Sequence, residues 1–341
     1  MSDQTVTMTL DEVLALARDC LSANGCDDDN ANAVAATIAA AERDGAASHG
    51  LFRLPGYVAS LRSGKVDGAA KPVIEKLAPG VVRADGRGGF APLALEAGRK
   101  PLIECARSQG IGALALTNIH HFAALWIEVE ALAANGLAAF AFTAYKPALA
   151  PAGSTQPLFG TNPMAFGWPR GDKPPMVFDQ ASAAMARGEI MIAARDGHEL
   201  PAGVGVDKDG NETTDPSAIL EGGAILPFGG YKGSAIALMV ELLVAGLIGQ
   251  DFSFEAAVND NNDGGPPRGG ELMLAIEPAH FGDPVGWLEH AERFFERYYS
   301  LEGTRLPADR RYANRVQNIK NGVEVRTELR DKIVSLTDSK K

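Results

Sequence analysis

Ser48 and His49, with Arg53 four residues beyond the histidine, form the first group whose types and spacing are suited to chemistry. A histidine can exchange a proton near neutral pH, a neighbouring serine can orient its ring, and an arginine fork can grip a carboxylate. If a helix begins here, its N-terminal end also favours an anion. The alternative is that Ser48 only caps the helix, while His49 and Arg53 are ordinary surface residues.

Two adjacent histidines form a second group in Asn118-Ile119-His120-His121-Phe122, which directly follows a strand predicted over 111–116. Residues at the carboxyl end of a strand in an α/β sheet commonly face the ligand crevice. Paired histidines also suggest a metal, but no carboxylate or cysteine accompanies them at ligand spacing. The sequence therefore predicts a binding site here without a metal.

A third group is the arginine-rich segment Arg305-Leu306-Pro307-Ala308-Asp309-Arg310-Arg311, predicted as a short loop. Guanidinium forks suit a phosphate, including the 2′-phosphate that separates NADP from NAD. The alternative is a solvated basic loop.

The common nucleotide and metal motifs are absent. Gly86, Gly88 and Gly89 do not fit the glycine spacing of the usual dinucleotide fingerprint, and the segment 229–234 breaks the Gly-Lys-Ser order of a phosphate loop. The acidic segment 207–218 lacks the glycine and the final glutamate of a calcium loop. These motifs alone support only an α/β enzyme of unspecified chemistry.

Both helices and strands must position these residues. Thr9 and Glu12 form a capping-box pattern, and the first third of the chain reads as helices at 10–21, 30–43 and 52–64. The middle of the chain alternates between strands and helices. Strands are predicted at 111–116, 137–143, 164–168, 176–178 and 271–276, and helices at 123–134, 181–194 and 285–299. A buried helix is predicted from 234 to 248, and loops at 201–216 and 259–270. The pattern predicts an α/β sheet domain packed against a helical part built from both chain ends.

Composition narrows the classes of function. The chain has 341 residues, 46% of them hydrophobic and 22% charged, which is ordinary globular usage. A net charge of −11 disfavours nucleic acid and anionic membranes as partners. With three cysteines and no apolar leader, we expect a cytoplasmic protein with reduced thiols.

Five sequence blocks together resemble the type-2 malate/L-lactate dehydrogenase family, also called L-sulfolactate dehydrogenase-like. They are Ser48-His49-Gly50-Leu51-Phe52-Arg53-Leu54-Pro55-Gly56-Tyr57, Gly160-Thr161-Asn162-Pro163-Met164-Ala165-Phe166-Gly167, Leu226-Pro227-Phe228-Gly229-Gly230-Tyr231-Lys232-Gly233-Ser234, Pro266-Pro267-Arg268-Gly269-Gly270-Glu271-Leu272 and the Arg305 to Arg311 segment. The segment His121-Phe122-Ala123-Ala124-Leu125-Trp126 is most similar to the branch that reduces Δ1-piperideine-2-carboxylate and Δ1-pyrroline-2-carboxylate.

The resemblance implies a fold unlike the doubly wound one. A mixed-sheet domain at 111–294 would bind NADP(H), or alternatively NAD(H). A mostly helical domain at 1–110 plus 295–341 would serve the substrate and a homodimer contact. The partners implied are a small carboxylate substrate and a second copy of the chain.

The resemblance also implies a role for each matched residue. His49 would donate a proton, Ser48 would orient it, Arg53 would hold the carboxylate, and Thr161 would touch the substrate. The residues implied to line the cofactor are His121, Phe122, Ala123, Ala124, Leu125, Asp179, Gln180, Ala181, Lys232, Arg305, Leu306, Pro307, Ala308, Asp309, Arg310 and Arg311.

Three positions depart from the imine-reductase pattern. Glu189 takes the place of the relay aspartate, Arg187 replaces a histidine, and Gln180-Ala181 replaces a Met-Ala pair. These changes leave two alternatives open. One is a 2-oxo acid reductase of the malate, lactate or ureidoglycolate type, and the other is a non-catalytic NADP-binding homologue.

Overall fold

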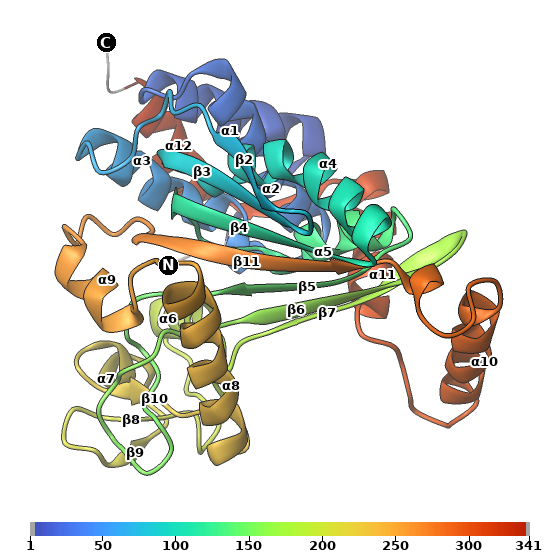
Figure 1. Cartoon of the computed structure of the whole chain (residues 1–341). Coiled ribbons are helices and arrows are strands. Elements are labelled where there is room, and N and C mark those ends of the chain that lie inside the picture. Colours follow the sequence, from blue (N-terminus) through green and yellow to red (C-terminus); the bar gives the residue numbers. More distant parts are fainter. Residues whose placement is uncertain (1–3, 339–341) are drawn as a thin grey trace.

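A seven-stranded mixed sheet forms the centre of the computed structural model, which describes residues 4–338 (Figure 1). Its strand order is β2-β3-β4-β11-β5-β6-β7, and only the β3–β4 pair is parallel. The strands are β2 (Val73–Ala78), β3 (Val81–Phe90), β4 (Ile111–His120), β11 (Arg268–Ile276), β5 (Ala138–Thr143), β6 (Met164–Arg170) and β7 (Lys173–Gln180).

Both faces of the central strands are covered. Helices α4 (Ala91–Gln109) and α5 (Leu125–Ala133) pack on one face, where Leu114 and Leu116 of β4 join the largest apolar core. Helix α8 (Tyr231–Glu241) and the π-helical segment Leu242–Leu247 cover the other face around Phe142 and Leu272. Burial on both faces explains why β4 and β11 read as continuous apolar runs.

The helical part is built from both chain ends, as predicted. Strand β1 (Thr5–Met8) pairs antiparallel with β12 (Val323–Arg326) and brings the two ends together. Around this pair, α1 (Leu10–Ala23), α2 (Asp28–Arg43), α3 (Leu54–Arg62) and α12 (Thr327–Asp338) enclose a second apolar core. The capping box is confirmed, because Thr9 accepts from the Glu12 amide and Glu12 accepts from the Thr9 amide.

The sheet extends further toward the N-terminus than the range 111–294. Strands β2 and β3, together with α4, precede residue 111 and were not predicted. Strand β3 was missed because Gly86, Gly88 and Gly89 interrupt its alternation of apolar and polar residues. Glycine is needed at position 86, since a Cβ there would overlap Ile119 of the neighbouring strand. Helix α4 carries Pro101 in its interior, which breaks the usual helix pattern.

Three predicted elements need correction. The helix predicted over 181–194 begins only at Arg187, because the Ser182 amide donates to Thr161 and the Ala184 amide donates to Leu226. The arginine-rich segment is not wholly a loop, since α11 (Asp309–Asn321) places two of its arginines in a first helical turn. The helix from Ser234 is not fully buried within the chain, because several of its apolar side chains are exposed.

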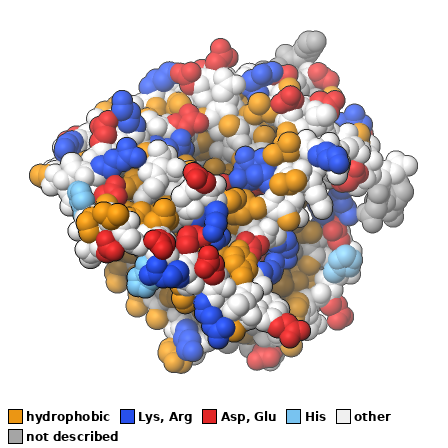
Figure 2. Space-filling model, turned by 90° about the vertical axis from the view of Figure 1, so that its right-hand side faces the viewer, with side chains coloured by type: hydrophobic (Ala, Val, Ile, Leu, Met, Phe, Trp, Pro, Cys, Tyr) orange, Lys and Arg blue, Asp and Glu red, His pale blue; other side chains and the backbone are white. Residues whose placement is uncertain are grey.

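The remaining elements lie around the sheet. They are α6 (Arg187–Asp196), α7 (Pro216–Leu220), α9 (Ser253–Asn259), α10 (Trp287–Tyr299) and a small sheet of β8 (Gly205–Val206), β9 (Glu212–Thr213) and β10 (Ala224–Ile225). On the face in Figure 2, acidic and basic side chains intermingle. Within residues 4–338, every helix is too short or too polar to cross a membrane.

Candidate active site

One cavity of about 960 Å³ lies where several strands of the sheet end. Strands β4, β5 and β7 run in the same direction, because each is antiparallel to the strand between them. Their carboxyl ends therefore meet at one edge, where His121, Tyr145 and Asp179 line the cavity. The turn between α2 and α3, the start of α6 and the segment before α11 close the other sides.

Ser48 and His49 lie on a short 3₁₀ turn, Ala47–His49, at the cavity wall. The Ser48 Oγ lies 3.0 Å from His49 Nδ1, so the serine fixes one ring nitrogen and leaves Nε2 for a ligand. The ring meets Trp126 edge to face at 5.6 Å. Gly50 is required here, because a Cβ would overlap the Glu42 carboxylate that accepts from the Leu51 amide.

Burial and nearby charge together decide the protonation state of His49. Burial, followed by the charges of Arg53, His121 and Arg311, lowers the pKa of His49 to about 3. The ring is therefore neutral at pH 7 in the ligand-free protein. An anionic ligand on either arginine offsets part of this effect and favours a proton on His49.

Arg53 is held with its guanidinium in the cavity. Its Nε donates to the Ser48 carbonyl at 2.7 Å, and its guanidinium carbon lies 4.8 Å from the centre of the Phe122 ring. Among the described residues it forms no ion pair, so its terminal nitrogens are available to a carboxylate. Thr161 lines the same cavity.

Glu189 lines the cavity but does not make the relay contact expected of it. Its side chain is exposed, and within residues 4–338 it has no hydrogen bond to Ser48 or His49. Helix α6 approaches the turn through Gly188, where a Cβ would lie 3.1 Å from Ser48 Cβ. Successive helical residues point about 100° apart, so Glu189 is turned away from Ser48.

Arg311 reaches the cavity from the first turn of α11. Its guanidinium carbon lies 4.8 Å from the Trp126 ring centre, and its buried Nη1 has no hydrogen-bond partner in the part of the chain described. Arg305, Leu306, Pro307, Ala308 and Arg310 line the same side. Asp309 turns inward instead, where it accepts from the Leu306 amide and the Tyr299 hydroxyl.

The other residues expected to line a cofactor fall into two sets. His121, Phe122, Ala123, Asp179 and Ala181 line the cavity. The other four do not line it. Ala124 and Leu125 are buried at the start of α5. Gln180 is exposed at the end of β7, and Lys232 is exposed on α8.

A group of charged residues that the sequence did not single out joins three helices behind the cavity. The Trp126 indole donates to Asp44 at 3.0 Å, and Arg315 of α11 pairs with both Asp44 and Glu130. The positive charges of Arg315 and Arg43 hold the pKa of Asp44 below its usual range despite burial. No spacing rule could link residues 44, 126 and 315, since the fold alone brings them together.

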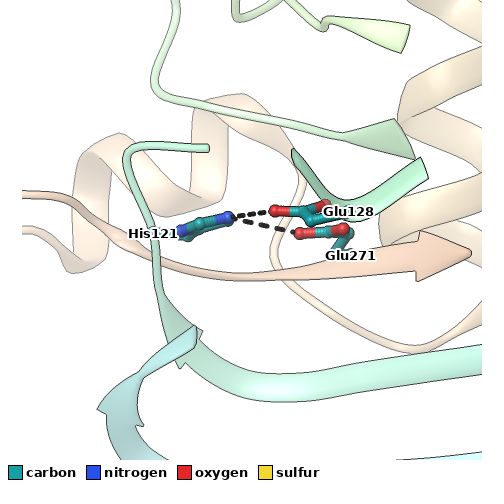
Figure 3. A group of neighbouring side chains, drawn as sticks. All are labelled: His121, Glu128 and Glu271. Atoms are coloured by element: carbon teal, nitrogen blue, oxygen red, sulfur yellow. Dashed lines mark hydrogen bonds and ion pairs between the residues drawn. The ribbon is translucent and has the colours of Figure 1, made fainter. Parts of the chain in front are cut away.

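His121 also has partners that the sequence did not indicate. Glu128 of α5 and Glu271 of β11 both face its ring (Figure 3). No carboxylate stands at ligand spacing from the paired histidines in the sequence, but β11 lies between β4 and β5 and brings the distant Glu271 to His121.

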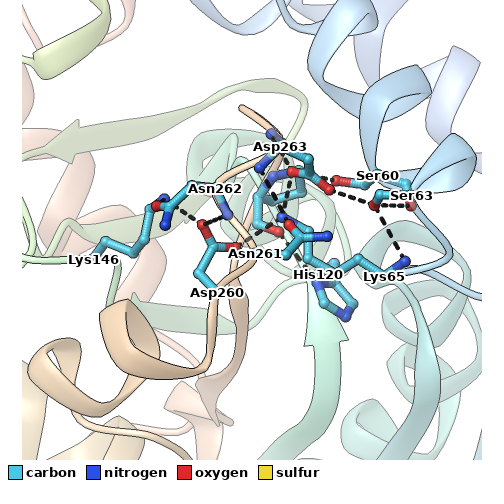
Figure 4. Close-up of polar contacts among 11 residues, drawn as sticks. Ser60, Ser63, Lys65, His120, Lys146, Asp260, Asn261, Asn262 and Asp263 are labelled. Atoms are coloured by element: carbon cyan, nitrogen blue, oxygen red, sulfur yellow. Dashed lines mark hydrogen bonds and ion pairs between the residues drawn. The ribbon is translucent and has the colours of Figure 1, made fainter.

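A loop between α9 and β11 forms another wall of the cavity through Gly264 and Gly265. Lysines hold this loop from two sides (Figure 4). Lys65 pairs with Asp260 at 2.8 Å and with Asp263 at 2.5 Å, and Lys146 pairs with Asp260 at 2.5 Å. Burial raises the pKa of Asp263, but these contacts bring it down to about 2, so the carboxylate stays charged.

Comparison with known proteins identifies the family of this chain. A family model described as malate/L-lactate dehydrogenase matches residues 8–334. The chain belongs to the malate/L-lactate dehydrogenase family. It is an oxidoreductase of mixed α/β fold, and its family uses a nicotinamide cofactor.

Three similar proteins set the context within that family. A Δ1-pyrroline-2-carboxylate reductase from Ancylobacter novellus is 48% identical over 95% of each chain. The crystal structure of Δ1-piperideine-2-carboxylate reductase from Pseudomonas syringae pvar. tomato matches with a TM-score of 0.92 and 44% identity, covering 97% of this chain and 100% of that one. A (2R)-3-sulfolactate dehydrogenase (NADP(+)) from Chromohalobacter salexigens is 44% identical over 90% of this chain and 91% of that protein.

The cavity suits a nicotinamide dinucleotide. Its volume is at the upper end of ordinary ligand pockets, as an extended cofactor with a substrate requires. The unpartnered Nη1 of Arg311, with Arg305 and Arg310 beside it, offers donors of the kind that bind phosphate.

Proposed function

We propose that this enzyme reduces cyclic imino acids, Δ1-pyrroline-2-carboxylate and Δ1-piperideine-2-carboxylate, to L-proline and L-pipecolate with NADPH. The observation that carries the proposal is the Ser48–His49 pair next to an unpaired Arg53 in one cavity. The names of several relatives at 44–48% identity, which are reductases of these two cyclic imino acids, support the same substrate class.

In this proposal Arg53 holds the substrate carboxylate and so fixes the ring of the imine. When bound, the reduced nicotinamide supplies the hydride that adds to the imine carbon. The electron pair of the C=N bond then moves to nitrogen, which takes a proton held at His49 Nε2. Ser48 keeps the His49 ring in place through Nδ1, and solvent restores the proton after turnover.

NADPH rather than NADH is proposed from the three arginines at the cavity. Arg305, Arg310 and Arg311 would hold the 2′-phosphate, and a guanidinium is the side chain best suited to a phosphate. The printed name of the sulfolactate dehydrogenase, which specifies NADP(+), supports this preference.

A second candidate is an open-chain 2-oxo acid that carries a further anionic group. Arg187 lines the same cavity as Arg53, and among the described residues it has no ion-pair partner. Burial raises the pKa of the Tyr145 hydroxyl, and the charges of Arg53 and Arg187 both oppose this shift. Two cations near one tyrosine would suit a dianion, and the sulfolactate dehydrogenase is a relative whose named substrate carries two acidic groups.

The test is turnover of the purified full-length enzyme, followed by cofactor absorbance, with each substrate and with NADPH or NADH. We expect kcat/KM for the two cyclic imines to exceed that for pyruvate, oxaloacetate and 3-sulfopyruvate by at least about tenfold, with NADPH preferred. An excess for 3-sulfopyruvate that disappears in Arg187→Gln would select the second candidate. NADPH binding without turnover of any substrate would indicate a non-catalytic homologue.

A further inference from the structure

The carboxyl groups of two glutamates meet one nitrogen of His121 beneath the cavity. His121 Nε2 lies 2.9 Å from Glu128 Oε1 and 3.5 Å from Glu271 Oε2. The exposed fractions are 8% for His121, 5% for Glu128 and 0% for Glu271. Because the two glutamates are buried, an ionised carboxylate among them needs a hydrogen-bonded partner.

The two distances show which glutamate accepts the hydrogen bond from His121 Nε2. A single Nε2–H can donate to one acceptor, and the 2.9 Å contact with Glu128 is the hydrogen bond. The 3.5 Å contact with Glu271 is too long and leaves both Glu271 oxygens without a hydrogen bond to any described residue other than the neighbouring Glu128. Two ionised carboxylates this close would repel strongly in a dry interior.

The surroundings of each glutamate decide which of the two carboxyl groups is ionised. Burial and the negative charge of Glu128 raise the pKa of Glu271 well above its usual value. Contacts with Glu271 and His121 lower the pKa of Glu128 despite its burial. Glu271 is thus the protonated member of the pair, and Glu128 is the carboxylate.

The opposite nitrogen of His121 is turned away from the carboxyls (Figure 3). This Nδ1 is buried and has no hydrogen-bond partner within residues 4–338, yet His121 lines the cavity. Its charge bears on His49, which lines the same space. A buried polar atom left without a protein partner is expected to bind something that enters the cavity.

We propose that Glu128 and Glu271 are a positioning pair, which fixes the His121 ring through Nε2 so that Nδ1 meets a polar atom of the bound carboxylate substrate or of the nicotinamide carboxamide. The inference rests on the proposed function, because it takes the ligand to carry such a polar atom. The pair then carries one negative charge, which the hydrogen bond from His121 Nε2–H stabilises at Glu128. A divalent cation on the same three side chains is the competing explanation, and the test separates the two.

The test compares two matched variants, Glu271→Gln and Glu128→Gln, in the full-length enzyme. Glutamine keeps the shape and neutrality of a protonated glutamate, so Glu271→Gln should lower kcat/KM by a clearly smaller factor than Glu128→Gln does. Glu128→Gln removes the carboxylate that accepts from His121 Nε2, so it should lower kcat/KM about 30-fold or more and change its pH profile. Equal effects, or a larger effect at Glu271, would overturn the assignment.

Two readouts besides activity keep the test decisive. The infrared carbonyl stretch of a buried protonated carboxyl should disappear in Glu271→Gln and persist in Glu128→Gln. Bound metal at one ion per chain in the parent, lost in both variants, would overturn the proton-sharing pair. Both variants should still bind NADPH; if NADPH binding is absent from the parent as well, the proposed function fails rather than this inference.

Discussion

At the scale of single residues, the environment of His49 determines how the site could deliver a proton. The ring is neutral before ligands bind, because burial and three cations hold its pKa at about 3. Neutrality leaves Nε2 free of charge repulsion toward Arg53, while a bound carboxylate would draw a proton onto the ring. Substrate binding and protonation of His49 are therefore coupled.

We predict that His49→Asn lowers kcat by about 100-fold or more, since general acid catalysis usually contributes that much. Ser48→Ala should cost about tenfold, because the ring loses one fixing hydrogen bond of 3.0 Å but keeps its contact with Trp126. Steady-state kinetics measure both effects, and NADPH fluorescence titration serves as the control. A His49→Asn enzyme with full turnover and normal cofactor binding would contradict the assignment.

Residues adjacent in sequence could be predicted as a site, whereas those joined by the fold could not. Ser48 and His49 lie on the 3₁₀ turn Ala47–His49 and Arg53 on the next one, Leu51–Arg53, so their types and spacing in the sequence were enough to predict their chemistry. The role expected for Glu189 depended on the direction of a helical side chain, which the approach of Gly188 decides. Glu271 reaches His121 only because β11 lies between β4 and β5.

At the scale of elements, the loop at 260–267 depends on two lysines for its position against the cavity. Lys65 is 9% exposed and serves two carboxylates that are as deeply buried. Removing one partner from a buried ion pair leaves an uncompensated charge. The loop would then move, taking Gly264 and Gly265 out of the cavity wall.

We predict that Lys65→Met lowers the free energy of unfolding by about 3 kcal/mol and raises KM more than it lowers kcat. Urea denaturation and steady-state kinetics measure these changes. Lys71→Met is the matched control, because Lys71 pairs with Asp27 and Asp29 at a site where its side chain is 61% exposed, and solvent-screened pairs of this kind contribute little to stability. Similar losses in both variants would show that the loop is not held by Lys65.

At the scale of the whole molecule, the fold class could be predicted from the sequence more accurately than the boundaries of the sheet. Alternating helices and strands indicated the α/β sheet, and the resemblance supplied a fold without the glycine fingerprint. The strands at 73–90 were missed because glycines break their pattern and the edge strand β2 is exposed along its length. Pairing between β1 and β12 joins residues more than 300 positions apart, which periodicity cannot reveal.

An apolar surface on α8, the following π-helical segment and α9 remains without cover. Leu242, Leu247 and Val258 are 55%, 66% and 82% exposed, and Tyr231, Leu238 and Phe254 on the same helices are exposed as well. Exposed apolar patches of this kind usually mark an interaction site. We propose that a second copy of the chain covers this surface in a two-fold symmetric dimer, which would bury the helix that the sequence predicted as buried.

Light scattering should therefore give twice the mass of the chain for the parent, and the mass of one chain for the double variant Leu242→Glu/Leu247→Glu. Charges placed on a buried two-fold interface meet their own copies, so each substitution acts twice against association. Val285→Glu, at a residue 88% exposed outside this surface, should remain dimeric. A parent of single-chain mass, or a double variant that stays dimeric, would mean that this surface is covered in another way or remains exposed.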